Sequence, residues 1–248
     1  MLANIQYRIL KRISPGAPDC CSGSVYEGKS KVAVLMGNEI FTKIAGKVII
    51  DFGCGDGTDA VEMARKGAKR VIGVDIRDDL LQTARQKALC AGVQNTCLFA
   101  SSTEEPADIV VSMDAFEHFA DPAGVLSIMN TLLQPAGEVL VSFGPTWYHP
   151  LGGHLFSVFP WAHLIFNEKA LLRWRSTFKT DGATRFSEVA GGLNQMTIAK
   201  FEELVAGSPL KFASFELIPI KKFRRFHNRV TREFVTAIVR CRLVKRTS

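Results

Sequence analysis

Short apolar segments alternate with amphipathic helical segments between Val48 and Phe143, and this alternation constrains the fold more than any other feature of the sequence. Strands that alternate with helices of this length form a parallel sheet with helices on both faces. The predicted strands are 48–50, 70–74, 96–100, 108–113 and 138–143, the predicted helices are 58–66, 78–91 and 122–133, and residues 134–137 are predicted to form a turn.

The pattern changes after residue 144. Residues 145–196 are rich in aromatic residues, histidine and glycine, with one clear helix that begins after Asn167, a good N-cap. A further helix is predicted over 198–205, and residues 212–218 and 234–243 alternate with a period of two, which is typical of antiparallel strands. We therefore predict an α/β fold: a doubly wound, mostly parallel seven-stranded sheet in one domain, with an inserted aromatic lid.

Composition places the chain among soluble globular proteins. Its 248 residues are 47% hydrophobic and 22% charged, which argues against a disordered chain. No uninterrupted apolar run reaches 18 residues and no secretory signal is recognisable, so we expect no stable membrane insertion. The six cysteines form no CxxC pair, which favours reduced thiols, no zinc site and a cytoplasmic location.

The net charge of +7 comes entirely from the C-terminal segment. Residues 221–248 contain ten Lys or Arg and one acid, which leaves 21 basic and 23 acidic residues in the rest of the chain. A basic segment can bind nucleic acid or an anionic membrane, or it can be the solvated face of ordinary strands. No RNA- or DNA-binding motif accompanies these charges, so we do not expect nucleic acid as a partner.

A glycine-rich loop follows the first predicted strand, with the spacing Asp51-x-Gly53-x-Gly55-x-Gly57. Glycines at such a turn let a ligand approach the backbone. The spacing is not G-x-G-x-x-G, and a carboxylate at the strand end would repel a pyrophosphate. The loop therefore favours a ligand that carries an amino group or a positive charge.

A second acid, Asp75, ends the second predicted strand, where a carboxylate can accept hydrogen bonds from both hydroxyls of a ribose. With the loop, and with residues 112–118 and 133–137, this pattern resembles the class I S-adenosylmethionine-dependent methyltransferases over residues 47–144. It is most similar to the small-molecule branch around the ubiquinone and menaquinone biosynthesis methyltransferases. The resemblance implies a Rossmann-like methyltransferase fold with a cofactor-binding core at residues 47–144. Around this core we predict an N-terminal cap (1–46), a substrate lid (145–196) and a final helix with antiparallel strands (197–248).

The resemblance also implies S-adenosyl-L-methionine as the cofactor. Asp51 and the glycine loop would hold its methionine part, Asp75 its ribose, and Ile76 would lie against its adenine. Many family members bind the adenine amino group through an acid after strand three, where this chain has Ser101 and Ser102. The implied cofactor-binding residues are Asp51, Gly53, Cys54, Gly55, Gly57, Asp75, Ile76, Ser101, Ser102 and Asp114.

The acceptor is expected beyond the fifth strand, because ligands of open α/β sheets bind at the carboxyl ends of the strands. The lid histidines His149 and His154 are candidates for the base that removes an acceptor proton. Candidate substrate contacts are His118, Trp147 and Tyr148. No convincing set of oxygen ligands surrounds Asp114, so no metal is predicted.

We therefore predict methyl transfer to a small-molecule acceptor, most simply at a hydroxyl. The acceptor itself, and the choice among O, N and C transfer, stay open, and the chain could form a homodimer. The alternatives are an RNA methyltransferase that uses the basic segment, and a cofactor-binding scaffold without turnover.

Overall fold

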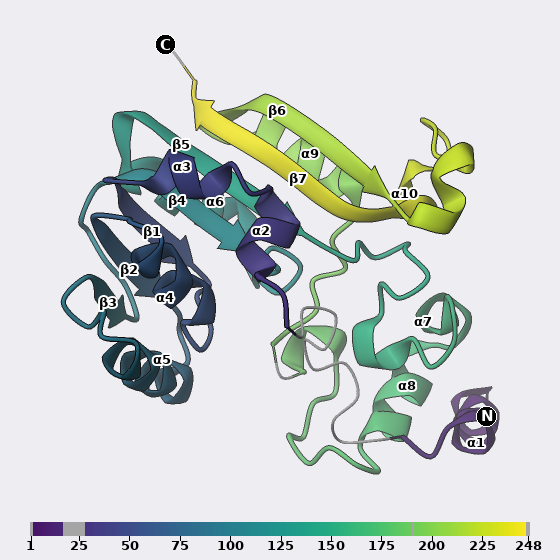
Figure 1. The fold of residues 1–248 in the computed structure, drawn as a ribbon. Helices are drawn as coiled ribbons and strands as arrows, with labels where there is room; N and C mark the ends of the chain where they lie inside the picture. Colours follow the sequence, from purple (N-terminus) through teal and green to yellow (C-terminus); the bar gives the residue numbers. More distant parts are fainter. Residues whose placement is uncertain (1, 17–27, 190, 247–248) are drawn as a thin grey trace.

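The computed structural model describes residues 2–16, 28–189 and 191–246, and its centre is a seven-stranded sheet with the order β3-β2-β1-β4-β5-β7-β6 (Figure 1). Strands β1 to β5 are parallel, whereas β7 runs antiparallel to both β5 and β6. This confirms the predicted doubly wound, mostly parallel sheet. The strands are β1 (Val48–Phe52), β2 (Arg70–Val74), β3 (Cys97–Ala100), β4 (Ala107–Met113), β5 (Leu133–Phe143), β6 (Leu210–Pro219) and β7 (Thr236–Lys245).

Helices cover both faces of the sheet, because successive strand residues point to opposite sides. Ile49 belongs to a core with α2 to α5, whereas its neighbour Ile50 belongs to a core with α6 and α9. No helix within the described ranges is long and apolar enough to cross a membrane. The helices are α1 (Leu2–Ile13), α2 (Lys31–Met36), α3 (Ile40–Ile44), α4 (Thr58–Arg65), α5 (Asp78–Cys90), α6 (Pro122–Leu132), η2 (His154–Phe156), α7 (Ala162–Ile165), α8 (Glu168–Arg175), η3 (Phe186–Glu188), α9 (Ile198–Ala206), η4 (Lys221–Phe226) and α10 (Arg232–Val235).

The predictions for the start of β5 and the start of β7 were wrong. Residues 134–137 lie within β5 instead of forming a turn before it, and the ladder to β4 shifts register between Ala107 and Ile109. Ala107 and Ile109 of β4 pair with Leu133 and Glu138 of β5, so β5 has extra residues between these two pairs. The extra residues form a strand irregularity whose residue types are typical of a turn. Residues 234–235 belong to α10, and β7 begins only at Thr236.

The segment 145–196 forms a small packed unit with its own hydrophobic core. Its helix α8 begins as predicted, with the Asn167 side chain accepting a hydrogen bond from the Ala170 N–H. The predicted N-terminal cap is divided between two places: α2 and α3 pack on the sheet, whereas α1 packs against α8 (Figure 1). The completely buried Leu10 of α1 lies in the same core as Trp174, whose indole N–H donates to the carbonyl of Ser14.

Two glycines of this unit, Gly152 and Gly153, have a packing role. A Cβ on Gly152 would lie 2.2 Å from the Thr146 carbonyl oxygen, and a Cβ on Gly153 would lie 2.3 Å from the Cβ of His163. Both distances are shorter than any van der Waals contact, so these residues are glycine because two parts of the chain meet there.

The packing of α1 is testable with two neighbouring residues. Leu10→Ala should lower the free energy of unfolding by about 2–5 kcal/mol, because it leaves a cavity in the core shared with α8. Ile9→Ala is the matched control, since the Ile9 side chain is 44% exposed, and its effect should be far smaller. Urea unfolding of both variants makes the comparison. Equal effects would show that α1 is not docked as described.

Candidate functional site

The loop between β1 and α4 lies where the strand order reverses, between β1 and its neighbours β2 and β4. Its glycines all have positive φ angles but differ in structural role. A Cβ on Gly57 would lie 2.5 Å from the Cβ of Ala84, so Gly57 allows α4 to pack closely on α5. A Cβ on Gly55 would meet no atom within 4 Å, which leaves open space above the backbone at this point. Open space over a glycine at a strand end is what a ligand requires to reach the main chain.

A cavity of about 970 Å³ begins beside this loop and extends to the segment after β5. It lies at the carboxyl ends of the parallel strands, where open α/β sheets bind their ligands. It brings together eight of the predicted site residues, which are Gly53, Asp75, Ile76, Ser101, Ser102, Asp114, His118 and His154.

Asp75 is buried at the end of β2 and both of its carboxylate oxygens accept hydrogen bonds. Arg77 binds it through Nε and Nη2, each at 2.9 Å, and the Gly55 N–H donates to Oδ2 at 2.9 Å. Burial alone would raise the pKa of Asp75, but the hydrogen bonds and charge of Arg77 outweigh it and hold that pKa below its usual range. Asp75 is therefore an ionised acceptor. The next residue, Ile76, is 90% exposed at the cavity, an unusual position for an isoleucine.

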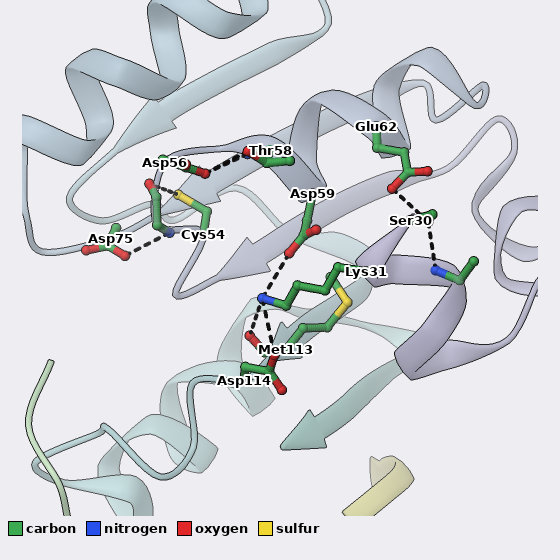
Figure 2. A network of polar contacts seen from close by, with 12 residues as sticks. Ser30, Lys31, Cys54, Asp56, Thr58, Asp59, Glu62, Asp75, Met113 and Asp114 are labelled. Atoms are coloured by element: carbon green, nitrogen blue, oxygen red, sulfur yellow. Dashed lines mark hydrogen bonds and ion pairs between the residues drawn. The ribbon is translucent and has the colours of Figure 1, made fainter. Parts of the chain in front are cut away.

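A second cluster of charges lies on the other side of the loop and is centred on Lys31 of α2 (Figure 2). Its Nζ lies 3.2 Å from Asp59 of α4 and 3.6 Å from Asp114 after β4. Ser30 caps α2 and donates to Glu62 of α4 at 2.9 Å. These contacts attach α2 to the site by polar interactions as well as by the core.

Asp51 is 2% exposed and contributes to this cluster electrostatically. Burial, reinforced by the negative charge of Asp59 and opposed by Lys31, raises the pKa of Asp51 to about 8. Its Oδ2 is buried and has no hydrogen-bond partner. Asp51 is therefore a neutral acid behind the loop and does not line the cavity.

Three other predicted residues of the loop also lie off the cavity wall. Gly55 and Gly57 shape the backbone, whereas the Cys54 side chain belongs to the core between the sheet and α5. Burial raises the pKa of the Cys54 thiol far above its usual range. The Cys54 side chain thus packs rather than facing a ligand.

Three ionisable side chains meet beside the cavity: Glu117 and His118 after β4, and His154 of η2. Of these, His118 and His154 line the cavity, whereas Glu117 is buried behind it. One ligand atom from each lies within 4.8 Å of those of the other two. The rings of His118 and His154 are 5.2 Å apart, and His118 Nδ1 lies 2.8 Å from the carbonyl oxygen of Gly192. Burial raises the pKa of Glu117 to about 8 and, with the neighbouring histidines, lowers that of His154 to about 4. We call Glu117, His118 and His154 the histidine end of the cavity.

The structure separates the two histidines that the sequence could not distinguish. His154 lines the cavity, and its Nε2 is buried without a hydrogen-bond partner. His149 is buried elsewhere, with its Nδ1 accepting a hydrogen bond from the Leu151 N–H at 3.0 Å. His149 therefore stabilises a turn and does not line the cavity.

The two aromatic residues predicted to contact substrate do not line the cavity either. Trp147 packs against His163 and Phe186 in the core of the inserted unit. Tyr148 is 38% exposed and packs against Phe234 beside β7. Trp147 and Tyr148 were predicted to contact substrate because they follow β5 directly. In the structure both rings pack against other side chains of the protein.

The cavity walls include residues that the sequence did not single out. Phe52 and Phe119 form an edge-to-face pair with ring centres 5.9 Å apart, and Leu155 and Phe156 add apolar surface beside His154. Arg175 of α8 is 4% exposed and forms a bidentate ion pair with Asp181 at 2.5 Å. From the sequence, an arginine on an amphipathic helix is expected to face solvent. Only the structure shows that Arg175 is buried at the cavity.

Part of the basic C-terminal segment is used inside the molecule. Arg232 forms a bidentate pair with Glu202, and Arg242 lies 3.4 Å from Glu138 across the sheet. Arg246 donates to the backbone carbonyls of Ala206, at the end of α9, and Ser208. These contacts favour the interpretation of the segment as the polar face of the sheet, while η4 carries four exposed basic residues.

The pKa of Asp51 predicts a pH dependence of stability. The folded chain keeps the Asp51 proton up to about pH 8, whereas the unfolded chain releases it at about pH 4. The folded state thus binds more protons in this window, and the free energy of unfolding must fall as pH rises through it, by at most about 1.4 kcal/mol per pH unit. Asp51→Asn removes this titration, so wild type should lose stability relative to the variant between about pH 5 and 8 and no further above. Urea unfolding at several pH values measures it, and parallel curves would contradict it.

Comparison with known proteins identifies the domain around the cavity. Residues 43–145 match the family model described as a methyltransferase domain, close to the segment 47–144 on which the sequence resemblance rests. The ubiquinone biosynthesis O-methyltransferase of Aeromonas salmonicida (strain A449) is 41% identical over 103 residues, 39% of this chain and 43% of that protein. The match therefore spans less than half the length of that relative.

Solved structures resemble the chain over nearly its whole length. The magnesium protoporphyrin IX methyltransferase from Synechocystis PCC 6803, crystallised with bound SAH, aligns with a TM-score of 0.56 at 16% identity, covering 99% of this chain and 96% of that one. The cyclase SpnF aligns with a TM-score of 0.55 at 12% identity, over 85% and 80% of the two chains. Residues 43–145 of this chain thus match a methyltransferase domain, within a chain whose fold is similar to that of a solved methyltransferase.

Proposed function

We propose that the chain methylates a hydroxyl group of a small molecule, with S-adenosylmethionine as the methyl donor. The observation that carries this proposal is that one cavity joins the acid and glycine loop at the ends of β1 and β2 to the histidine end. A fold alone does not fix a reaction, because the same architecture supports different chemistries. The proposal therefore rests on the residues of the cavity.

The cofactor fits the half of the cavity beside β1 and β2. Gly55 leaves room at the backbone, and Asp75 is an ionised acceptor that suits two ribose hydroxyls once Arg77 moves aside. The exposed side chain of Ile76 offers an apolar surface for an adenine ring, with Ser101 and Ser102 at its rim. When bound, S-adenosylmethionine supplies a methyl group on a positively charged sulfur.

The acceptor fits the half beside the histidine end. Its walls include Phe119, Leu155 and Phe156, which favour an apolar or aromatic molecule and limit water in the site. A neutral hydroxyl must lose its proton to become a strong nucleophile. His154, which lines the cavity with a neutral imidazole and has no hydrogen-bond partner at Nε2, is the group best placed to receive or polarise that hydrogen.

This proposal predicts the ligand preference of the purified chain. S-adenosylmethionine and its demethylated product should bind, and NAD should not, in isothermal titration calorimetry. Asp75→Ala should weaken binding by roughly 1–3 kcal/mol, because it removes a buried hydrogen-bonded partner, which is about 5- to 150-fold in dissociation constant. Asp79→Ala is the matched control, since Asp79 is an exposed acid at the start of α5. Binding of NAD in place of the methyl donor would refute the cofactor assignment.

The second prediction concerns His154. With methyl-labelled cofactor and a pool of small metabolites, His154→Ala should lower the turnover number by roughly 10²–10⁴, the usual effect of losing a general acid–base group. Its affinity for S-adenosylmethionine should stay nearly unchanged, because the proposal assigns His154 to the acceptor and not to the cofactor. His149→Ala should instead lower the free energy of unfolding and leave the turnover of the folded protein intact. The reverse pattern would assign the chemistry to His149.

A further inference from the structure

Two basic side chains line the cavity from the side of the inserted unit. Arg175 is the last residue of α8, and the Lys179 N–H donates to the Arg175 carbonyl at 3.0 Å, so Lys179 follows one helical turn later. Side chains four residues apart on such a turn lie on the same face. His154 of the same unit lines the same cavity, so this unit supplies both the candidate base and two positive charges.

The guanidinium of Arg175 is held in one orientation. Arg175 is 4% exposed, and its two Nη atoms each donate to one carboxylate oxygen of Asp181 at 2.5 Å. Asp181 does not line the cavity. A guanidinium has five N–H groups and this pair uses two of them, so three are left for a ligand at the cavity wall.

Lys179 differs from Arg175 in its pairing. Its side chain is half-buried at the cavity, and among the residues that the structure describes no carboxylate lies within ion-pair distance of it. A charge that is partly removed from water is costly unless it is paired. The ion pair of Arg175 can hold the turn after α8 in place, but that role does not account for Lys179. A negatively charged ligand would satisfy both side chains.

The acids that line the cavity do not belong to the inserted unit, and each has a partner of its own. Asp75 accepts hydrogen bonds from Arg77. Asp114 lies 3.6 Å from the Nζ of Lys31, and Asp121 accepts from a backbone N–H at the start of α6. The described residues that line the cavity between positions 153 and 193 include no acid. This wall of the cavity is therefore positive.

We propose that Arg175 and Lys179 bind an anionic group of the acceptor, which is a carboxylate or a phosphate. The planar fork of an arginine matches two oxygens of either group, and the lysine adds a point charge. Apolar neighbours such as Leu155 and Phe156 exclude water, which strengthens the attraction between the charges.

This inference rests on the proposed function and names the class of acceptor. The acceptor is a small apolar or aromatic acid that places its hydroxyl near His154 and its anionic group beside α8. Two anchoring points on one rigid unit would fix which hydroxyl faces the methyl donor, because positioning supplies most of the rate of a displacement at carbon. An acceptor without the acid group would keep the hydroxyl but lose this orientation.

Anion binding can be tested without knowing the acceptor. The full chain is first saturated with S-adenosylhomocysteine, because the cofactor has a carboxylate of its own, and is then titrated with benzoate, phenyl phosphate and the neutral benzamide by calorimetry and ligand-detected NMR. One of the two anions should bind about tenfold or more tightly than benzamide, the effect expected of a hydrogen bond to a charged group. The tighter anion identifies the group as a carboxylate or a phosphate, and its affinity should fall as salt is added.

Two variants assign the binding to these side chains. Lys179→Met removes the charge at similar length, and Arg175→Lys keeps a charge to pair with Asp181 but removes the planar fork. Each should reduce the preference for the anion by about tenfold and leave the affinity for S-adenosylhomocysteine unchanged. Lys169→Met is the matched control, because Lys169 is an exposed lysine of α8 that does not line the cavity, and it should bind the anion as wild type does. Circular dichroism confirms that each variant is folded.

Equal affinity of the folded wild-type chain for all three probes, or absence of binding by both anions, overturns the anion site. Unchanged anion binding by Lys179→Met and Arg175→Lys overturns the assignment to these residues. Weaker binding of S-adenosylhomocysteine by both variants would show instead that the two cations hold the carboxylate of the cofactor. Anion binding as expected, with no methyl transfer to any acceptor, would refute the proposed function and leave the anion site standing.

Discussion

The parallel pairing of β1 with both β2 and β4 is the constraint on which the rest of the structure depends. Residue 51 is paired with Gly73 on one side and with Val111 on the other, so the three strands end together. The loop after β1, Asp75 after β2 and Asp114 after β4 therefore meet at one edge of the sheet. The cavity forms there because β2 and β4 carry the chain away from β1 in opposite directions.

Burial then divides the acids of this edge into two kinds. Asp75 is buried but receives hydrogen bonds from Arg77 and Gly55, so it stays ionised and can accept further hydrogen bonds. Asp51 is buried without such donors, and its pKa rises to about 8. Two aspartates at the ends of neighbouring strands thus differ in charge at neutral pH, because the number of N–H donors around each one differs.

Much of this could be predicted from the sequence, because the signals are local. The alternation of strands and helices predicted the mostly parallel sheet, and the N-cap residue Asn167 predicted the start of α8. Asp75, Ile76 and Asp114 line the cavity, and each follows the end of a parallel strand. Their role in binding a cofactor stays a prediction. The turn predicted at 134–137 failed, since a strand irregularity and a turn have the same residue types.

The sequence by itself determined the order of strands and helices, the glycine loop and the acids at the strand ends. Only the tertiary structure decided which of the lid residues face a ligand, because this depends on contacts between segments far apart in the chain. His149 and Trp147 pack within the inserted unit, whereas His154 meets His118 across the cavity. The packing of α1 on α8 likewise could not be predicted from the periodicity of the sequence. Periodicity indicates which face of a helix is apolar, but not which element covers that face.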